Sequence, residues 1–471
     1  MTLCSKFVKI ISDYYKKKKG SRTFLVIEYI ISIWFILGIC GLLAYGLSLA
    51  FWYYLDSPVL EEPELKDWRS QQLLETTGSE TPTTPLPTTT TSFKSTTASR
   101  QLISTTTSNS KLLPAASCGK RIVGYFMAWE NADLRQEQLR KLTHVIYLFA
   151  TIQVPGVIKL DNEKRFLELK DKAHSLKSDL KVMIGVGGHA TSFRLSLILP
   201  DDGKRKILID SIVSSIDEHD LDGVDIFWIW SWMEDKLHYP KFVRELRKAL
   251  NNLKSSKKRT EDYLISIIVP PKIETIEEGY NINEIVKSVD FLNVLTYDYY
   301  FNGDRIGPHS PIYGGTRGNI DETMKYLVCE TRQPIKINMA VPFYGTFWRN
   351  ASLPLQDGSE EIWKEKGEAT GPFAVRWREL VPNGWHKSIA RFHEKSKTSY
   401  IWIPETKPFL TFEDERSLAE KAKYVKDHQL GGILISAIDQ DDDQSTLLNV
   451  VSSADICSQK EKDYIDYICD K

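Results

Sequence analysis

Eight short runs rich in β-branched and aromatic residues alternate with charged, amphipathic helical patterns along the chain after Arg121. Such runs favour buried strands, and their alternation with helices is typical of a parallel sheet. Eight repeats over roughly 320 residues exceed the ~250 residues of a TIM (β/α)8 barrel, so we predict this α/β fold with an insertion. The excess falls between the seventh and eighth strands, from Gly345 to Phe412. The predicted strands are Ile122–Phe126, Thr143–Phe149, Lys181–Val186, Gly223–Trp230, Leu264–Val269, Phe291–Tyr297, Lys336–Pro342 and Gly432–Ile438. The clearest helical patterns are Lys164–His174, Lys204–His219, Lys241–Leu253 and Glu415–His428.

The fourth predicted strand carries two apolar residues where a hydrolytic site needs acids. Side chains two apart on a strand share a face, so Asp225, Phe227 and Ile229 lie on the same face. A ladder of acids on this face would support proton chemistry, but Phe227 and Ile229 can neither donate a proton nor carry charge. Activity in a TIM barrel belongs at the C-terminal ends of the strands, which is where both residues fall.

The segment Asp222–Ser231 resembles the signature Asp-Gly-x-Asp-x-Asp-Trp-Glu of family 18 glycoside hydrolases, the chitinases and chitinase-like lectins. Phe227 stands at the third Asp of that signature and Ile229 at the Glu. Four residues match it: Asp222, Gly223, Asp225 and Trp228. Five further segments resemble other strands of the family, in the right order: Arg121–Trp129, Lys181–Gly188, Leu292–Asp298, Lys336–Gly345 and Gly431–Asp442.

The resemblance implies how the chemistry is changed. Family 18 enzymes use the substrate's own N-acetyl group as nucleophile. In them a Glu protonates the leaving oxygen and an Asp orients the acetamide, and these are the positions of Ile229 and Phe227. Loss of a general acid lowers rates by ~10²–10⁴, and loss of electrostatic stabilisation lowers them by a further ~10²–10³. We therefore expect no catalytic residue in this motif. Three other acids, Glu234, Asp298 and Asp439, are not placed by the sequence within reach of a glycosidic oxygen.

Asp225 then needs a structural explanation. A lone buried carboxylate is costly unless it is protonated or hydrogen-bonded. The resemblance implies that Gly185 has lost a hydroxyl that the family places nearby. We predict that Asp225 is a structural carboxyl, either neutral or bonded to water.

The resemblance also implies an aromatic groove that binds sugars. Trp129 and Trp230 are candidate ligand contacts, although core packing is the alternative for both. Tyr297 and Asp298 resemble the pair that orients the substrate. The groove is incomplete at two positions where chitinases have Trp, namely His189 and Ser436. We interpret His189 as a loop residue rather than a catalyst.

Three functions remain from this pattern. The first is a membrane-anchored chitinase-like protein without hydrolase activity that binds a glycan or a protein partner. The second is a lectin for chitin or N-acetylglucosamine polymers, and the third is a weakly active chitinase that uses a displaced acid. We predict no cofactor and no metal, because the acids at 439–443 lack a spaced ligand loop and fit a solvated loop. The balance of 61 basic and 62 acidic residues argues against a nucleic-acid partner.

A second region, residues 29–55, is 27 residues long and carries no charge. Roughly 20 apolar residues cross a bilayer, whereas the core of a signal peptide has ~7–15. Basic residues precede the run and acidic residues follow it, so the N-terminal tail 1–28 is predicted to be cytoplasmic. We predict a single-pass type II membrane protein whose C-terminal domain is extracellular or lumenal. A cleaved signal peptide and a buried helix are the alternatives.

Residues 56–117 are predicted to form a stalk. From Thr76 to Ser110, 21 of 35 residues are Ser or Thr, a composition that cannot offset the entropy of ordering. O-glycosylation would hold such a stalk extended, and a bare flexible linker is the alternative.

The predicted barrel domain is 118–456, with a tail at 457–471 and an insertion at about 346–412 that the resemblance implies to be α+β. Four cysteines lie on the non-cytoplasmic side of the predicted span: Cys118, Cys329, Cys457 and Cys469. An oxidising compartment favours two disulfides, but the sequence allows three pairings. Cys457–Cys469 is the simplest guess for one of them. Asn350 begins an N-glycosylation sequon.

Overall fold

The computed structural model describes residues 118–471 with the exception of 177, 302, 352–361, 458–468 and 470–471. The predicted cytoplasmic tail (1–28), membrane span (29–55) and stalk (56–117) lie outside the described residues. Within the described part of the chain, no helix is both long enough and apolar enough to cross a bilayer. The membrane anchor stays a prediction from the sequence.

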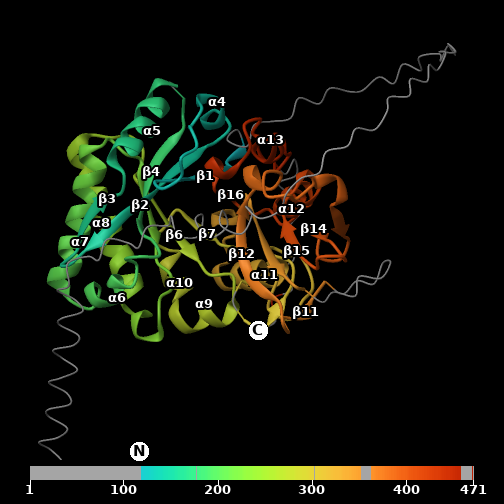
Figure 1. The fold of residues 1–471 in the computed structure, drawn as a ribbon. Coiled ribbons are helices and arrows are strands. Elements are labelled where there is room, and N and C mark those ends of the chain that lie inside the picture. The colour runs from blue at the N-terminus through green and yellow to red at the C-terminus, as the bar shows by residue number, and fades with distance from the viewer. Residues whose placement is uncertain (1–117, 177, 302, 352–361, 458–468, 470–471) are drawn as a thin grey trace, which may run out of the picture. The chain divides into compact units, whose positions relative to one another are not determined.

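Eight parallel strands close into a barrel in the described domain (Figure 1). The ring closes at β1, which pairs with β2 on one side and with β16 on the other. The predicted TIM (β/α)8 barrel is confirmed. A short extra strand, β3 (Val157–Leu160), forms an antiparallel hairpin with β2. The barrel strands are β1 (Arg121–Met127), β2 (His144–Gln153), β4 (Lys181–Gly187), β5 (Gly223–Phe227), β6 (Leu264–Val269), β7 (Phe291–Val294), β9 (Ile337–Pro342) and β16 (Gly432–Ser436).

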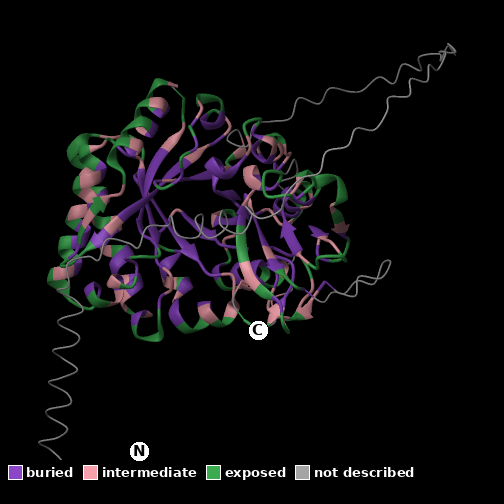
Figure 2. Cartoon of the chain, viewed as in Figure 1, coloured by how far each residue is buried: buried purple, intermediate pink, exposed green. Residues whose placement is uncertain are grey.

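Helices pack around the barrel through apolar faces that recur at helical spacing. In α5 the buried residues are Phe166, Leu169 and Ala173, so one face packs inward and the other meets solvent. Figure 2 shows the barrel strands buried and the outer faces of the helices exposed. Outside the insertion, the helices and 3-10 turns of the described residues are α4 (Gln136–Leu139), α5 (Glu163–Ser175), α6 (Arg194–Ile198), α7 (Asp202–Glu218), η2 (Met233–Asp235), α8 (His238–Lys257), α9 (Ile273–Gly279), α10 (Ile282–Ile285), α11 (Ile320–Thr331), η3 (Pro334–Lys336), α12 (Glu415–Asp427), η6 (Ile438–Gln440) and α13 (Thr446–Ser453).

Three barrel strands end earlier than the sequence predicts. β5 ends at Phe227, β7 ends at Val294 and β16 ends at Ser436. After Phe227 the backbone leaves the ladder, because the N–H of Ile229 donates to Oγ of Ser192 at 3.1 Å instead of to a neighbouring strand. The residues that follow these strands therefore belong to loops at the C-terminal end of the barrel. We call this end the mouth.

The insertion between β9 and β16 forms its own five-stranded antiparallel sheet, in the order β12-β10-β15-β14-β13. It begins at Tyr344, slightly before the predicted bound, and ends at Phe412. The expected α+β character is wrong for its described residues, whose helical part consists of the 3-10 turns η4 (Trp377–Glu379) and η5 (Lys387–Ile389). Pro382 and Gly384 separate these turns and disfavour a longer helix. The strands are β10 (Tyr344–Arg349), β11 (Lys364–Glu365), β12 (Thr370–Arg376), β13 (Arg391–His393), β14 (Thr398–Trp402) and β15 (Phe409–Phe412), and β11 pairs with β8 (Arg305–Ile306).

Two disulfides join the four cysteines of the domain. They are Cys118–Cys457 and Cys329–Cys469, with Cα–Cα distances of 5.9 and 5.5 Å. The predicted pair Cys457–Cys469 is wrong. The physical reason is the closure of the barrel, which brings the first and last strands side by side. Cys118 immediately precedes β1 and Cys457 follows α13, so these two residues meet at the same seam.

Candidate functional site

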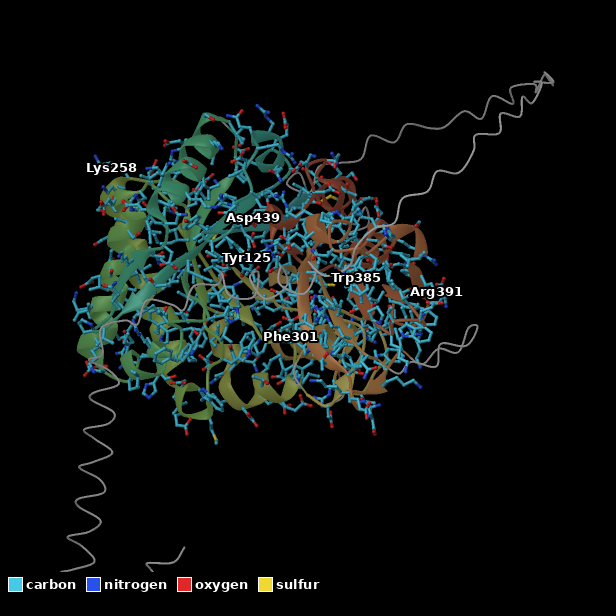
Figure 3. The ribbon with its side chains drawn as sticks, in the orientation of Figure 1. Tyr125, Lys258, Phe301, Trp385, Arg391 and Asp439 are labelled. Atoms are coloured by element: carbon cyan, nitrogen blue, oxygen red, sulfur yellow. A yellow bond between two sulfur atoms is a disulfide. The ribbon has the colours of Figure 1, made fainter. Side chains whose placement is uncertain are left out.

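Asp225 lies inside the barrel on β5 and is fully buried. Its carboxylate accepts hydrogen bonds from three side chains: Tyr125 Oη at 2.9 Å, Ser266 Oγ at 2.5 Å and Asn293 Nδ2 at 3.1 Å. Burial raises the pKa of Asp225, and the three donors oppose that rise. We predicted that Asp225 is either neutral or bonded to water. In the structure its hydrogen bonds come from side chains of the protein. Tyr125 is labelled in Figure 3.

A row of polar side chains continues from Asp225 through the interior of the barrel. Asn338 on β9 donates from Nδ2 to Oδ1 of Asn293 on β7 at 3.0 Å. Arg121 at the start of β1 donates from Nε to Oδ1 of Asn338 at 3.0 Å. Buried polar groups are tolerated when they are hydrogen-bonded in this way. The row ties four barrel strands to one another and makes Asp225 part of the scaffold.

Gly185 lies beside Asp225 in the register of β4 and β5. A Cβ atom at Gly185 would lie 2.5 Å from Cδ2 of Leu148, which is closer than real Cβ atoms approach a neighbour. The side chain of Leu148 thus occupies the space in which a side chain at 185 would stand. Ser266 supplies a hydroxyl donor to Asp225 from the other neighbouring strand, β6.

Phe227 lies in an aromatic cluster at the mouth. Its side chain is 5% exposed, and its ring packs edge-on against Phe149 with centroids 4.7 Å apart. The ring of Tyr125 lies 5.7 Å away. Ile229 is half-buried and packs against the same apolar cluster. Position 227 is therefore enclosed by hydrocarbon, and a carboxylate placed there would lose its hydration.

The two candidate tryptophans have different surroundings. Trp129 is 51% exposed and stacks on Phe149, with ring centroids 5.5 Å apart and an interplanar angle of 24°. Trp230 is half-buried and packs against the apolar interior of the barrel. Packing against the core thus accounts for the buried part of the Trp230 side chain. Trp129 instead combines a supporting ring with exposed area, which suits stacking against the apolar face of a sugar.

Tyr297 and Asp298 lie in the loop after β7 and both have protein partners. The hydroxyl of Tyr297 donates to Oγ of Ser436 at 3.1 Å, so Ser436 interacts with this pair where a chitinase has Trp. Tyr344 donates to Oδ2 of Asp298 at 2.9 Å. Nδ1 of His309, which is buried, lies 3.2 Å from Oδ1 of Asp298. The side chain of Asp298 is 34% exposed, so it is oriented by the protein and still meets solvent.

The burial of Asp439 is the largest departure from the sequence prediction. A solvated loop was expected at 439–443, but Asp439 and Asp441 are buried. Oδ2 of Asp439 accepts from the N–H of Met127 at 3.0 Å and from Arg165 at 3.2 Å. Burial is the main cause that raises the pKa of Asp439 to about 7 and that of Asp441 to about 6. The sequence signal that could have indicated this burial is position, since Asp439 lies in η6, shortly after the buried strand β16 ends at the mouth. Asp439 is labelled in Figure 3.

Glu130 is a further buried acid that the sequence interpretation missed. It follows Trp129, and its Oε1 accepts from Nε of Arg376 at 2.7 Å. Gln440 donates to the same oxygen at 3.4 Å. Because Arg376 belongs to β12, this contact joins the insertion to the barrel beside Trp129.

The other residues that the sequence singled out lie at the surface. Glu234 is exposed on η2, and His189 is exposed with its ring 6.4 Å from that of Phe227. Burial of part of the imidazole lowers the pKa of His189. Asn350 is exposed directly after β10, which leaves its side chain accessible for a glycan. Among the described residues, no group of three or more His, Cys, Asp or Glu side chains is arranged to hold a metal ion.

Comparison with known proteins settles the family. The model of glycosyl hydrolases family 18 matches residues 121–441. This chain belongs to that family. Human chitinase-3-like protein 2 is 24% identical over 360 residues, which cover 70% of this chain and 89% of that protein. Sporulation-specific chitinase 2 of Saccharomyces cerevisiae is 28% identical over 272 residues, which cover 54% of this chain and 53% of that protein.

Solved structures share the fold of this family member. An N-acetylglucosaminidase from Paenibacillus barengoltzii has a TM-score of 0.62 at 23% identity, covering 71% of this chain and 99% of that one. Human YKL-39, described as a pseudo-chitinase with retained chitooligosaccharide binding, has a TM-score of 0.61 at 21% identity, covering 72% of this chain and 98% of that one. The match accounts for nearly all of both solved chains, so a domain of this kind folds on its own.

Proposed function

We propose that this chain is a chitinase-like protein that binds an N-acetylated glycan at the barrel mouth without hydrolysing it. The observation that carries the proposal is the environment of Phe227, whose ring is enclosed by Phe149 and Tyr125. Hydrolysis needs an ionisable group within hydrogen-bond reach of the glycosidic oxygen. Phe227 and Ile229 place hydrocarbon where the family's signature has that group.

The retained acids have other tasks in the structure. Asp225 binds three side chains of the scaffold, and Asp439 binds Met127 and Arg165. Both carboxyls are buried, whereas a general acid must come within hydrogen-bond reach of the glycosidic oxygen. These contacts count against the alternative of a chitinase that works through a displaced acid.

Glycan binding is supported by two side chains at the mouth. Trp129 offers exposed ring area on a supporting ring, and Asp298 is partly exposed and held by Tyr344. Aromatic stacking with a few oriented polar groups is how protein sites recognise sugars. The relative YKL-39 is described as binding chitooligosaccharides, which makes N-acetylglucosamine oligomers the first ligand to test. The absence of Trp at Ser436 leads us to expect weaker binding than in a relative that has this ring.

The anchoring of the domain is part of the same proposal. The uncharged run 29–55 would span the membrane, and the Ser/Thr-rich segment 56–117 would hold the barrel away from it. Two disulfides and an exposed sequon at Asn350 are consistent with a compartment outside the cytoplasm. Enzymatic removal of N-glycans from the full chain in intact cells should lower its apparent molecular mass. Asn350→Gln should abolish that change in mass. A chain that carries no N-glycan in the wild type would count against this topology.

A titration with N-acetylglucosamine tetramer tests the proposed function, on the fragment 106–471 produced by secretion, which contains the barrel domain and the last residues of the predicted stalk. We expect saturable quenching of tryptophan fluorescence, no response to a glucose tetramer that lacks the acetamide, and no release of reducing ends. Release of reducing ends that stops when one carboxyl is neutralised would contradict the proposal. No response to either sugar would favour a protein partner instead.

Restoring the two acids should not restore an ordinary chitinase. Phe227→Asp with Ile229→Glu returns the signature, but Ser436 still leaves the sugar without its aromatic floor, and an aromatic contact of this kind contributes ~1–3 kcal/mol. Reducing-end assays of the double variant, with Ser436→Trp added as the matched third change, separate these contributions. Full activity in the double variant alone would show that the floor is unimportant.

A further inference from the structure

Five large apolar side chains are exposed together beside the mouth. Phe193 and Leu197 belong to α6 and its N-terminal end, and the others lie on or next to η2. We call these five residues the α6–η2 patch: Phe193, Leu197, Trp232, Met233 and Leu237. Their side chains are between 46% and 77% exposed. Figure 1 shows α6 outside the ring of barrel strands.

The backbone under the α6–η2 patch is fixed by hydrogen bonds of two buried side chains, Asp235 and Ser231. Asp235, which is buried, accepts from Oγ of Ser196 on α6 at 2.8 Å and from the N–H of Trp232 at 3.1 Å. Oγ of Ser231 donates to the carbonyl of Gly279 at 2.9 Å. One carboxylate thus joins the two halves of the patch. The apolar residues are displayed on a rigid support, which lowers the ordering cost of binding a partner.

The α6–η2 patch is as large as the largest apolar patches that monomers expose, and it approaches the area of one side of an interface. With ~150–250 Å² for a large aromatic side chain, the exposed fractions amount to roughly 600 Å² of apolar surface. The largest such patch on a typical monomer is about 300–600 Å². A standard interface buries about 800 Å² on each partner. Two copies of the patch in contact would therefore bury most of the area that a stable dimer needs.

The chemistry of the patch favours a second copy of this chain as its occupant. Charged side chains of both signs lie on it: Glu234, Lys236, which also donates to the carbonyl of Glu277, and Arg194, whose guanidinium carbon lies 5.7 Å from the ring centroid of Phe193. An acid of one copy can therefore face a base of the other in a two-fold pairing. The net charge of the whole chain is −1, so two copies do not repel at long range. Leu197, Met233 and Leu237 offer a sugar neither hydrogen bonds nor ring faces. Trp, Phe and Met are the residues that protein interfaces enrich.

We propose that the barrel domain forms a homodimer in which the α6–η2 patch of one copy packs against the same patch of another. The patch follows β4 and β5, whereas Trp129 follows β1. Pairing through the patch therefore uses different side chains from those proposed to bind the glycan. The dimer presents two mouths, and a polymeric ligand that reaches both is bound with higher avidity than by one.

Sedimentation equilibrium of the secreted fragment 106–471 at about 1–100 μM tests the dimer. We expect a wild-type mass that rises from one chain toward two with concentration, and a Met233→Lys/Leu237→Lys variant that stays at one chain mass with an unchanged melting temperature. The matched control is Val381→Lys/Ile389→Lys, two comparably exposed apolar residues on the insertion, and it should dimerise like the wild type. A wild type that stays monomeric at the highest concentration, or a control that dissociates equally, overturns the proposal.

Two further readouts keep this test apart from that of the proposed function. Binding of N-acetylglucosamine tetramer to one site should be equal in the wild type and in the Met233→Lys/Leu237→Lys variant. If that variant loses sugar binding while the wild type is monomeric, the patch is a glycan surface and the dimer is wrong. If the wild type is monomeric and floats with phosphatidylcholine vesicles while the variant does not, the patch is a lipid surface and the dimer is again wrong.

Discussion

Replacing Phe227 by Asp should destabilise the barrel and should do so in a way that depends on pH. The change removes a ring that packs on Phe149 at 4.7 Å and on Tyr125 at 5.7 Å, and it places a carboxyl in the same space. Truncating a buried Phe to a small side chain costs about 3–5 kcal/mol of unfolding free energy. The new carboxyl also faces Asp225, which shares the same side of β5.

The charge of the new carboxyl contributes a separate and measurable part of the loss in unfolding free energy. If the enclosure raises the pKa of an Asp at 227 by two units, its ionised form loses about 3 kcal/mol relative to its neutral form. The folded state then holds the proton more tightly than the unfolded state does. Stability is therefore greatest below pH 4 and falls as the pH rises toward the raised pKa near 6.

Phe227→Asn is the matched control, because Asn removes the same ring and has nearly the shape of Asp but does not titrate. Urea unfolding of the fragment 106–471, followed by tryptophan fluorescence, should give equal stabilities for the two variants near pH 4. At pH 8 the Asp variant should be less stable than the Asn variant by about 3 kcal/mol. Titration of Asp225 and Asp439 affects both variants and cancels in the difference. Equal stabilities at pH 8 would mean that water reaches position 227, and the apolar enclosure would be refuted.

Three other outcomes follow from the contacts of the site. Asp439→Asn should flatten the pH dependence of the melting temperature. Burial raises the pKa of Asp439 to about 7, so the wild type loses stability as the pH rises from about 4 to 7. An unchanged slope in the variant would contradict this. Trp129→Ala should weaken the binding of N-acetylglucosamine tetramer about tenfold by calorimetry, which is ~1.4 kcal/mol, whereas Phe373→Ala on the insertion should leave it unchanged. Cys118→Ser with Cys457→Ser should lower the free energy of unfolding by about 5 kcal/mol, because the disulfide closes a separation of 339 residues; a loss below ~1 kcal/mol would show that the unfolded chain is not constrained by it.

The barrel was predictable from the sequence because its signal is local and repeated. Runs such as Leu264–Val269 are buried on both faces, so their uninterrupted apolar character identifies strands without knowledge of their neighbours. The two-residue period of a strand likewise placed Asp225 and Phe227 on one face, and both lie in the interior. Fold and motif therefore followed from patterns that a short window of sequence contains.

The features that were missed depend on contacts between distant segments. Cys118 pairs with Cys457 because the first and last strands of the barrel lie side by side. No local sequence pattern indicates which cysteine lies next to Cys118 in the fold. Asp439 is buried because Arg165 and Met127 approach it from two other elements, although a run of acids ordinarily indicates a solvated loop. β5 ends at Phe227, earlier than predicted, because the backbone N–H of Ile229 donates to Oγ of Ser192. In each case the partner lies dozens or hundreds of residues away.

The disulfide at the seam also determines how the domain bears load. A pull on the chain ahead of Cys118 reaches a covalent bond to Cys457 before it reaches the first hydrogen bond of β1. Force is thereby shared between β1 and the segment that follows α13. A domain held by its amino-terminal end, as a tethered domain would be, thereby carries a covalent link across the seam at which its first and last strands meet.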